Sequence, residues 1–258
     1  MNNTARTSRR RFLTRFAAGA GTLLLAGCER LSESEWFPKV LSAGERLSQA
    51  AQTLVTGRKA MAQEFSEVDP SPTFRSNGTA EPDSEAYAAL AAKGFADYRL
   101  EVGGLVGAAR SFSLADLRAL DSRTQITRHD CVEGWSAIGK WKGAKLSALL
   151  DVVKVKPEAR YVVFYCADPM SDEGKDLYYE SIDMDDAWHP QTILAYELNG
   201  EALPIKNGAP LRLRVERQLG YKHAKYVMRI EVVESFAHIA GGNGGYWEDQ
   251  GYQWYAGI

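Results

Sequence analysis

The chain has 258 residues, with 31 lysine and arginine side chains against 33 aspartate and glutamate side chains, and a pI near 6.1. The resulting net charge of −2 excludes the basic surface on which nucleic-acid binding depends. The sequence contains no Walker loop, no GxGxxG motif and no CxxCH haem motif. Nucleotide, dinucleotide and c-type haem chemistry are therefore not predicted.

The N-terminus has the pattern of an export signal. Residues 8–14 hold three consecutive arginines followed by Phe-Leu-Thr, a twin-arginine pattern, and residues 16–25 are mainly apolar. This apolar run is shorter than the ~20 residues that span a membrane. It ends in Leu25-Ala26-Gly27-Cys28, the pattern of a lipoprotein cleavage site. We predict a twin-arginine lipoprotein signal peptide over residues 1–27 and a periplasmic protein anchored to the membrane by a lipid on Cys28.

Residues 28–70 are predicted to be a tether that carries one amphipathic helix. Ser42 and Glu45 have the spacing of a capping box, and apolar side chains follow at helical spacing, at Leu47, Ala50, Ala51, Leu54 and Val55. The pattern leaves open whether this face packs on the main body or on a partner. Proline residues at 70 and 72 mark a break, so the catalytic domain is predicted over residues 71–258.

The elements expected in this domain are short and do not alternate regularly. We expect a strand at 98–102, a turn at Gly103-Gly104, helices at 113–117 and 145–150, and strands at 161–165, 211–215 and 226–233. The absence of a strand–helix repeat favours an α+β fold over a doubly wound sheet.

Cys131 is the most informative residue of the chain. It lies among polar residues in the segment Arg-His-Asp-Cys-Val-Glu-Gly-Trp at 128–135, whereas Cys166 ends an apolar strand. In such a polar setting we expect nearby dipoles and donors to favour the thiolate, which binds soft metals. The residues alone leave open a structural disulfide between Cys131 and Cys166. The three cysteines do not have zinc-site spacing.

Residues 203–225 contain Asn-Gly-Ala-Pro-Leu-Arg and then Gly-Tyr-Lys-His-Ala-Lys. Together with the Cys131 segment they resemble the molybdopterin domain of the sulfite oxidase superfamily. The exported bacterial branch that includes the periplasmic methionine sulfoxide reductase catalytic subunits is most similar. The resemblance implies an α+β domain of mixed sheets and short helices, a molybdenum-molybdopterin cofactor, and two-electron oxygen-atom transfer on a small sulfoxide- or sulfite-like substrate.

The resemblance also implies the site. Cys131 becomes the molybdenum ligand and catalytic residue, since a pterin dithiolene leaves room for one more soft anionic ligand. Arg212 is expected to hold the cofactor phosphate with its planar guanidinium. Gly208 and Gly220 are expected to let the backbone approach the pterin. The implied cofactor-binding residues are Arg75, Asn77, Cys166, Asn207, Arg212, His223, Ala224 and Lys225.

Other residues have two interpretations. Arg212 and Arg214 share one strand face, so one of them is a candidate partner for Glu216. Lys222 is interpreted as a surface residue, and His189 as a structural histidine in a turn. Among the C-terminal aromatic residues, Tyr246, Trp247 and Tyr252 are candidates for the pocket wall, the remainder being expected to pack the domain edge.

No electron carrier is visible in the sequence. We therefore expect a monomer that exchanges electrons with a separate protein, such as a membrane or periplasmic cytochrome. The alternative hypothesis is a lipid-anchored protein that binds molybdopterin, or serves as a scaffold, without catalysis.

Overall fold

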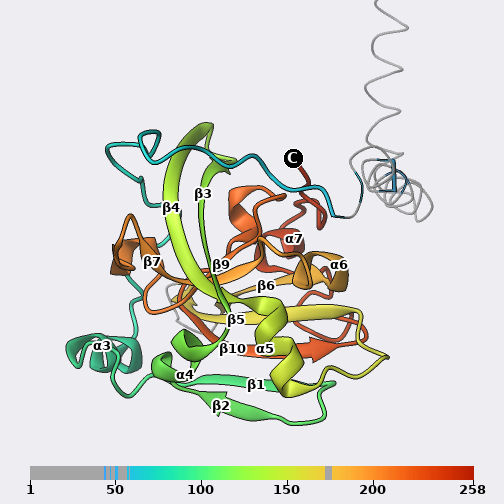
Figure 1. Ribbon diagram of the computed structural model, residues 1–258. Helices are drawn as coiled ribbons and strands as arrows, with labels where there is room; N and C mark the ends of the chain where they lie inside the picture. The colour runs from blue at the N-terminus through green and yellow to red at the C-terminus, as the bar shows by residue number, and fades with distance from the viewer. Residues whose placement is uncertain (1–43, 45–46, 48–49, 52–56, 58, 172–175) are drawn as a thin grey trace, which may run out of the picture. The chain divides into compact units, whose positions relative to one another are not determined.

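The computed structural model describes residues 44, 47, 50, 51, 57, 59–171 and 176–258 (Figure 1). The chain divides into two units, Met1–Val55 and Thr56–Ile258. In the first unit, Gly44, Leu47, Ala50 and Ala51 are helical, within the segment expected to form a helix. The predicted signal peptide and Cys28 lie outside the described residues. None of the helices in the described ranges has both the length and the apolar character of a membrane span.

The second unit contains short helices and two sheets, one mixed and one antiparallel. Its helices are α3 (Glu85–Ala92), α4 (Leu114–Ala119), α5 (Leu146–Val153), α6 (Met184–Ala187) and α7 (Tyr246–Asp249), with 3-10 turns η1 (Ile205–Asn207) and η2 (Gly220–Lys222). The strands are β1 (Leu100–Gly104), β2 (Arg110–Phe112), β3 (Ser122–Cys131), β4 (Trp135–Lys145), β5 (Tyr161–Pro169), β6 (Leu177–Asp183), β7 (Ile193–Leu198), β8 (Glu201–Ala202), β9 (Arg212–Arg214) and β10 (Val227–Val233). This composition confirms the predicted α+β class.

The first sheet has the order β2-β1-β10-β5-β6, and its strands lie together in the lower half of Figure 1. β1 pairs with β10 in parallel, and the other pairs are antiparallel. Gly103 and Gly104 belong to β1, so the turn predicted there is wrong. A Cβ on Gly104 would lie 2.2 Å from the carbonyl oxygen of Val232, so the close parallel pairing with β10 requires glycine.

The second sheet has the order β3-β4-β7-β8, with β9 also paired to β7. Its main feature is the long antiparallel hairpin of β3 and β4, in register from Ser122 opposite Ala144 to Cys131 opposite Trp135. Sequence reasoning did not predict these two strands, because β3 shows no regular alternation and the alternating buried positions of β4 are mostly small residues. The pairing with β9 brings Arg212 and Arg214 into the same sheet as the cysteine hairpin.

The segment before residue 71 is attached to this second sheet. Glu64 forms a bridge with Thr127, and the backbone N–H of Phe65 donates to the carbonyl of Ile126 at 2.8 Å. The side chain of Gln191 exchanges hydrogen bonds with both backbone groups of Ala62. The segment therefore packs on the same compact unit, which begins at Thr56.

Trp141 on β4 is the central packing residue beneath the site. It is fully buried, and its ring meets the Phe74 ring edge-on with centroids 5.0 Å apart. The guanidinium groups of Arg214 and Arg212 lie over the same ring at 4.4 and 5.4 Å. A buried aromatic residue of this size typically contributes about 3–5 kcal/mol to stability. The ring therefore links the hydrophobic core to the charged groups of the site.

Candidate active site

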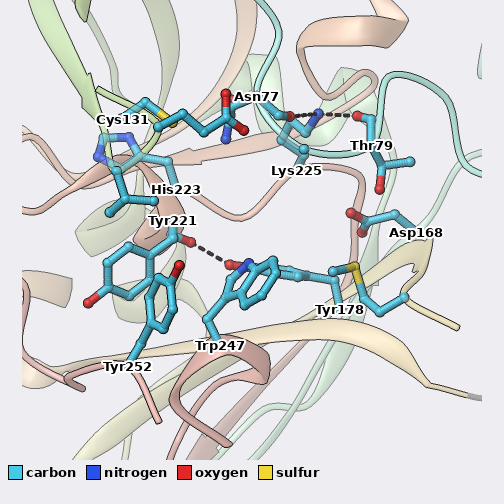
Figure 2. A pocket seen from close by; sticks show the side chains of 14 residues that line it. Asn77, Thr79, Cys131, Asp168, Tyr178, Tyr221, His223, Lys225, Trp247 and Tyr252 are labelled. Atoms are coloured by element: carbon cyan, nitrogen blue, oxygen red, sulfur yellow. Dashed lines mark hydrogen bonds between the residues drawn. The ribbon is translucent and has the colours of Figure 1, made fainter. Parts of the chain in front are cut away.

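Cys131 lies at the tip of the β3–β4 hairpin. Its carbonyl accepts a hydrogen bond from the N–H of Gly134 at 3.0 Å, and Gly134 has a φ of +83°. The three-residue connection 132–134, with a glycine in the left-handed region, is a common short hairpin turn. This turn fixes the cysteine on a rigid element, with its side chain on the wall of a cavity (Figure 2). Cys131 and Cys166 are both free thiols, so the alternative of a disulfide between them is wrong.

The protein alone does not favour the thiolate of Cys131. Burial raises the pKa of the thiol, and the carboxylate of Glu133 adds to this, while the backbone N–H of Glu133 and the charges of Arg212 and Arg75 lower it. The net direction is upward, which contradicts the expectation that the polar surroundings stabilise the thiolate. The partial burial of the thiol raises its pKa by more than the nearby donors lower it. A metal ion would supply the missing positive charge, because ligation displaces the thiol proton.

The cavity has a volume of about 200 Å³ and two different walls. Figure 2 shows the aromatic side chains gathered along one side and the polar groups along the other. The polar wall includes Asn77, Thr79, Asp168, His223 and Lys225. The apolar wall includes Val132, Met170, Tyr178, Tyr221, Trp247 and Tyr252. Trp247 and Tyr252 therefore line the pocket, as expected for two of the three C-terminal aromatic candidates.

Arg212 is completely buried and has no carboxylate partner among the residues that the structure describes. Its Nη1 donates to the carbonyl of Asn207 and its Nη2 to the Oδ1 of Asn77, both at 3.1 Å, and its Nε has no partner. Burial, with the nearby charge of Arg214, lowers the pKa of Arg212 to about 9. Buried charges are normally paired. An unpaired guanidinium with a free N–H therefore marks a site for an anion.

Arg214 lies on the same face of β9 as Arg212, and it has a carboxylate partner. It forms a two-point ion pair with Glu216, at 2.8 and 2.5 Å, and its Nη1 donates to the Nδ1 of His129 at 3.0 Å. Of the two arginines weighed from the sequence, Arg214 is thus the structural partner of Glu216. Arg214 also fixes the imidazole of His129, two residues before Cys131, and so helps to orient this segment.

Lys225 is the second cation without a carboxylate bond. Its ammonium group donates to the carbonyls of Asn77 and Thr79, which holds the loop 77–79 against the cavity. Burial and then the charge of Arg212 lower the pKa of Lys225 to about 7. Gly208, with a φ of +112°, lies between the two cations, and a Cβ there would be 3.0 Å from the Lys225 side chain. Glycine at 208 therefore allows the cations to approach each other.

Two further buried polar atoms near the site have no hydrogen-bond partner among the described residues. His223 is buried, and burial followed by the charges of Arg214 and Arg212 holds its pKa well below the usual value. The neutral ring donates from Nε2 to the carbonyl of Gln218 at 3.0 Å, which leaves Nδ1 as an acceptor without a partner. The amide nitrogen of Asn207 is buried and unpaired as well. Within the described residues, the Nε–H of Arg212 and the amide nitrogen of Asn207 are donors without a partner, and the Nδ1 of His223 is an acceptor without one. These groups fit a phosphate and the polar edge of a pterin.

The other residues assigned from the family resemblance lie farther from the cavity wall. Asn207 and Ala224 are buried beside Arg212 and Lys225, and Arg75 lies over the ring of Trp135 at 5.6 Å. Cys166 is buried on β5 and is not among the lining residues. Gly220 faces the imidazole of His129, where a Cβ would be 2.6 Å from the ring. The cofactor roles of these residues remain predictions.

Lys222 is not on the surface, so that interpretation is wrong. It is completely buried, and its ammonium group donates to Glu180 at 2.5 Å and to Glu248 at 2.6 Å. These residues come from η2, β6 and α7, the elements that also supply Tyr221, Tyr178 and Trp247 to the cavity. The triad therefore fixes the relative positions of three parts of the wall. Sequence reasoning missed this triad, because Glu180 and Glu248 lie 42 and 26 residues away from Lys222.

His189 is a structural histidine, as interpreted. It follows α6, and its Nδ1 accepts a hydrogen bond from the N–H of Gln191 at 3.2 Å. Its Nε2 lies 3.1 Å from the carbonyl of Ala60. The residue thus secures the segment before residue 71, and it is not among the residues that line the cavity.

Comparison with known proteins identifies the family. Residues 88–238 match the profile of the family described as "Oxidoreductase molybdopterin binding domain". The chain is 38% identical over 97% of its length to the "Putative protein-methionine-sulfoxide reductase subunit YedZ1" of Azospira oryzae, and it covers 88% of that protein. It is 35% and 37% identical to the protein-methionine-sulfoxide reductase catalytic subunits MsrP of Ralstonia nicotianae and Xanthomonas axonopodis pv. citri, over 66% and 55% of its length.

These two MsrP sequences are longer, and the chain covers 53% and 47% of them. Among solved structures, the sulfane dehydrogenase SoxCD from Paracoccus pantotrophus matches with a TM-score of 0.49 and 27% identity, over 54% of this chain and 39% of that one.

The family model and the relatives show a molybdopterin-dependent oxidoreductase that transfers oxygen atoms. The chain belongs to the oxidoreductase molybdopterin binding domain family, and its cofactor is molybdenum-molybdopterin. The resemblance drawn from Cys131 and residues 203–225 is thereby confirmed, and the hypothesis of a non-catalytic scaffold is set aside.

Replacing Arg212 by alanine should reduce the molybdenum and pterin content of the purified protein at least about tenfold, because a charge-assisted contact to the phosphate is lost. The same change should not destabilise the cofactor-free protein, since it removes an unpaired buried charge. The measurement is metal analysis with pterin fluorescence, alongside thermal melts of both forms. Unchanged cofactor content would contradict the phosphate role.

Replacing Lys222 by methionine should destabilise the protein by about 3–5 kcal/mol, because two buried carboxylates lose their cation. Burial already raises the pKa of Glu180 well above its usual range. Without Lys222 the folded variant must hold extra protons, so its stability should fall as the pH rises from about 4 to 8. Urea unfolding at several pH values measures this.

The matched control for this variant is Lys93→Met. Lys93 pairs with Asp97, and the two side chains are 65% and 61% exposed, so its loss should change little. Equal stability of the two variants would contradict the structural role of the triad.

Proposed function

We propose that this enzyme reduces sulfoxides, and specifically methionine sulfoxide carried by proteins. The observation that carries the proposal is the cavity itself: it is lined by the predicted metal ligand Cys131 and has an apolar wall of aromatic side chains and Met170. A methionine sulfoxide has an apolar chain on either side of one polar S=O group, which suits a cavity with one apolar and one polar wall. The names of the relatives point to the same substrate class.

The rim of the cavity supports a substrate attached to a protein. Val132, next to Cys131, is 46% exposed, and Tyr252, which also lines the cavity, is 42% exposed. The site thus opens at the protein surface through apolar side chains. A side chain projecting from another folded protein could reach this rim without entering a deep channel. Thioether and sulfoxide groups also make favourable contacts with aromatic rings, such as those of Trp247 and Tyr252.

The overall reaction consumes two electrons and two protons and converts a sulfoxide to a thioether and water. When bound, the cofactor supplies the two-electron oxygen-atom chemistry. The protein contributes the soft ligand Cys131, the cations that hold the phosphate, and the walls that orient the substrate. Arg214 and His129 hold the strand on which the ligand is placed. The hairpin turn then keeps the thiol in one position as substrates enter and leave.

We further propose that the enzyme is exported and anchored by lipid in the periplasm. It is a monomer there and receives electrons from a separate electron-transfer protein. The twin-arginine pattern at residues 8–14 and the Leu-Ala-Gly-Cys sequence ending at Cys28 support export and lipid attachment. The separate electron donor is supported by the sequence, which has three cysteines and no haem motif to serve as a built-in carrier.

Replacing Cys131 by serine should lower the turnover of a methionine-sulfoxide peptide by a reduced viologen dye. The loss should exceed the roughly 10- to 100-fold that follows removal of a residue that only orients a metal ligand. Thermal melting should show an intact fold, because serine fits the same space. Wild-type protein that oxidises sulfite and leaves the peptide sulfoxide untouched would contradict the proposed substrate.

Replacing Cys28 by alanine tests the anchor and provides a matched cysteine control. The variant should move from the membrane fraction to the soluble fraction, because the acylated side chain is lost. Its turnover should equal that of the unaltered protein, in contrast to Cys131→Ser. Fractionation and fatty-acid labelling measure the outcome, and a variant that stays on the membrane would refute lipid anchoring at Cys28.

A further inference from the structure

A second hollow in the surface, which we call the groove, lies next to the aromatic wall of the cavity. Its volume is about 640 Å³, against about 200 Å³ for the cavity. The rings of Tyr165, Tyr179 and Tyr246 line it, together with the apolar side chains of Leu177 and Ile239. These residues come from β5, β6, α7 and the loop before α7. The reaction proposed above makes no use of the groove.

The groove is separated from the cavity by a thin wall of aromatic rings. Tyr246 and Trp247 are consecutive residues of α7, and Tyr246 lines the groove whereas Trp247 lines the cavity. The ring centroid of Tyr246 is 5.3 Å from that of Trp247 and 6.2 Å from that of Tyr178, which also lines the cavity. Figure 2 shows Trp247 and Tyr178 on the aromatic side of the cavity. Because electrons move quickly between proteins only over short, well-packed distances, a donor seated in the groove can serve the cavity.

The wall between the two hollows is fixed in place. Glu248 of α7 accepts a hydrogen bond from the buried Lys222 at 2.6 Å. Asp249 of α7 accepts one from the hydroxyl of Tyr179 at 2.5 Å and others from the backbone of the loop 241–243 at 2.9 and 3.1 Å. Burial opposes the charge of Asp249, but these hydrogen bonds together lower its pKa. The groove is therefore formed before a partner binds, which reduces the entropy lost on binding.

The groove carries negative charge around an apolar centre. Among the described residues that line it, Asp176 and Asp249 are the charged ones, and no lysine or arginine is present. The guanidinium of Arg229 lies over the ring of Tyr165 at 3.7 Å, but it donates to Glu231 at 2.8 Å and is thereby neutralised. Complementary charge steers the encounter of two proteins, and the interfaces of electron-transfer proteins are small and short-lived. The groove thus fits a basic protein surface.

The position of the groove also separates electron entry from substrate entry. The exposed side chains of Val132 and Tyr252 line the cavity and not the groove. A protein seated in the groove therefore leaves the opening of the cavity free for a peptide. Reduction can then take place while the substrate is bound.

We propose that the groove docks the basic face of the electron-transfer protein that reduces this enzyme, a carrier held in the same membrane as the lipid anchor. Each encounter oxidises the carrier by one electron. Two encounters supply the two electrons that are consumed, with two protons, when a sulfoxide becomes a thioether and water. The rings of Tyr246, Trp247 and Tyr178 are the packed medium between groove and cavity and are not themselves oxidised. The inference rests on the proposed function, which requires a separate electron donor.

The first test reverses one charge of the groove in the full-length enzyme. Asp176→Lys is compared with Glu158→Lys, a matched control, because Glu158 is an exposed acid in the turn before β5, beyond the end of the β5–β6 pair opposite to Asp176. Each variant replaces the unaltered protein in the source bacterium, and washed membranes are assayed for turnover of a methionine-sulfoxide peptide. The electrons come either from NADH, through the carriers of the membrane, or from a reduced viologen dye.

Asp176→Lys should lower the NADH-supported turnover about tenfold or more at low ionic strength, because the carrier meets a like charge. Its dye-supported turnover should equal that of the unaltered enzyme, since a small dye does not need the docking surface. Glu158→Lys should keep both activities. Equal NADH-supported turnover of the two variants would overturn the inference, and so would an unaltered enzyme that works with the dye and not with NADH. Failure of the dye to support peptide turnover would instead contradict the proposed function.

A second test blocks the groove without changing its charge. Leu177 is 48% exposed, so Leu177→Cys can be coupled to a bulky polyethylene glycol maleimide, with Glu158→Cys as the matched control. Cys166 is only 2% exposed and is shielded from the reagent. Coupling at residue 177 should abolish NADH-supported turnover and leave dye-supported turnover unchanged, while uncoupled Leu177→Cys and coupled Glu158→Cys keep both. Full NADH-supported turnover after coupling at residue 177 would refute docking at the groove.

Discussion

The burial of two cations without carboxylate partners is the constraint on which the rest of this site depends. The fold pairs its other deeply buried cations: Arg214 with Glu216, and Lys222 with Glu180 and Glu248. Arg212 and Lys225 instead donate to neutral oxygen atoms, and burial lowers the pKa of both. The protein thus keeps positive charge in its interior that an anionic cofactor compensates on binding. Cofactor binding and folding stability are therefore linked in this chain.

This arrangement needs a rigid support, which the second sheet provides. β9 carries Arg212 and pairs with β7, which also pairs with β4 of the cysteine hairpin. Trp141 on β4 lies under both Arg212 and Arg214. The phosphate-binding candidate and the metal-ligand candidate are consequently fixed by one sheet and one core residue. A single rigid sheet would therefore hold the residues for the metal and for the phosphate at a constant separation.

The sequence was sufficient for the fold class, for the main strands of the first sheet and for the parts of the site that lie in contiguous motifs. Cys131 could be found because it is a cysteine in a polar segment, and Arg212, His223 and Lys225 because they share one stretch with family-specific spacing. Four of the assigned residues, Asn77, Cys131, His223 and Lys225, meet at the cavity. The others are buried behind it or lie beside it, a distinction that depends on side-chain packing.

What could not be predicted depends on contacts between distant elements. Asp168 and Lys222 look like ordinary polar residues in the sequence, and only the packing of β5, β6, η2 and α7 makes them buried. The direction of the Cys131 pKa was likewise wrong from sequence, because desolvation depends on what covers the hairpin tip and not on its neighbours in the chain. The long β3–β4 hairpin was missed because the burial pattern of β3 is irregular, and because β4, which does alternate, has the small residues Ala137, Gly139 and Gly143 at most of its buried positions.

The two walls of the cavity suggest how this scaffold separates cofactor binding from substrate choice. The polar wall is made by β5, the loop 77–79 and residues 223–225, all tied to buried charges or backbone carbonyls. The aromatic wall comes from β6, η2, α7 and the segment that follows α7. In this wall the rings of Trp247 and Tyr252 are in contact, with centroids 5.3 Å apart. Changes in the aromatic wall can therefore alter which substrate is accepted without touching the groups that hold the cofactor. The buried triad joins η2, β6 and α7, the elements that carry Tyr221, Tyr178 and Trp247 of the aromatic wall.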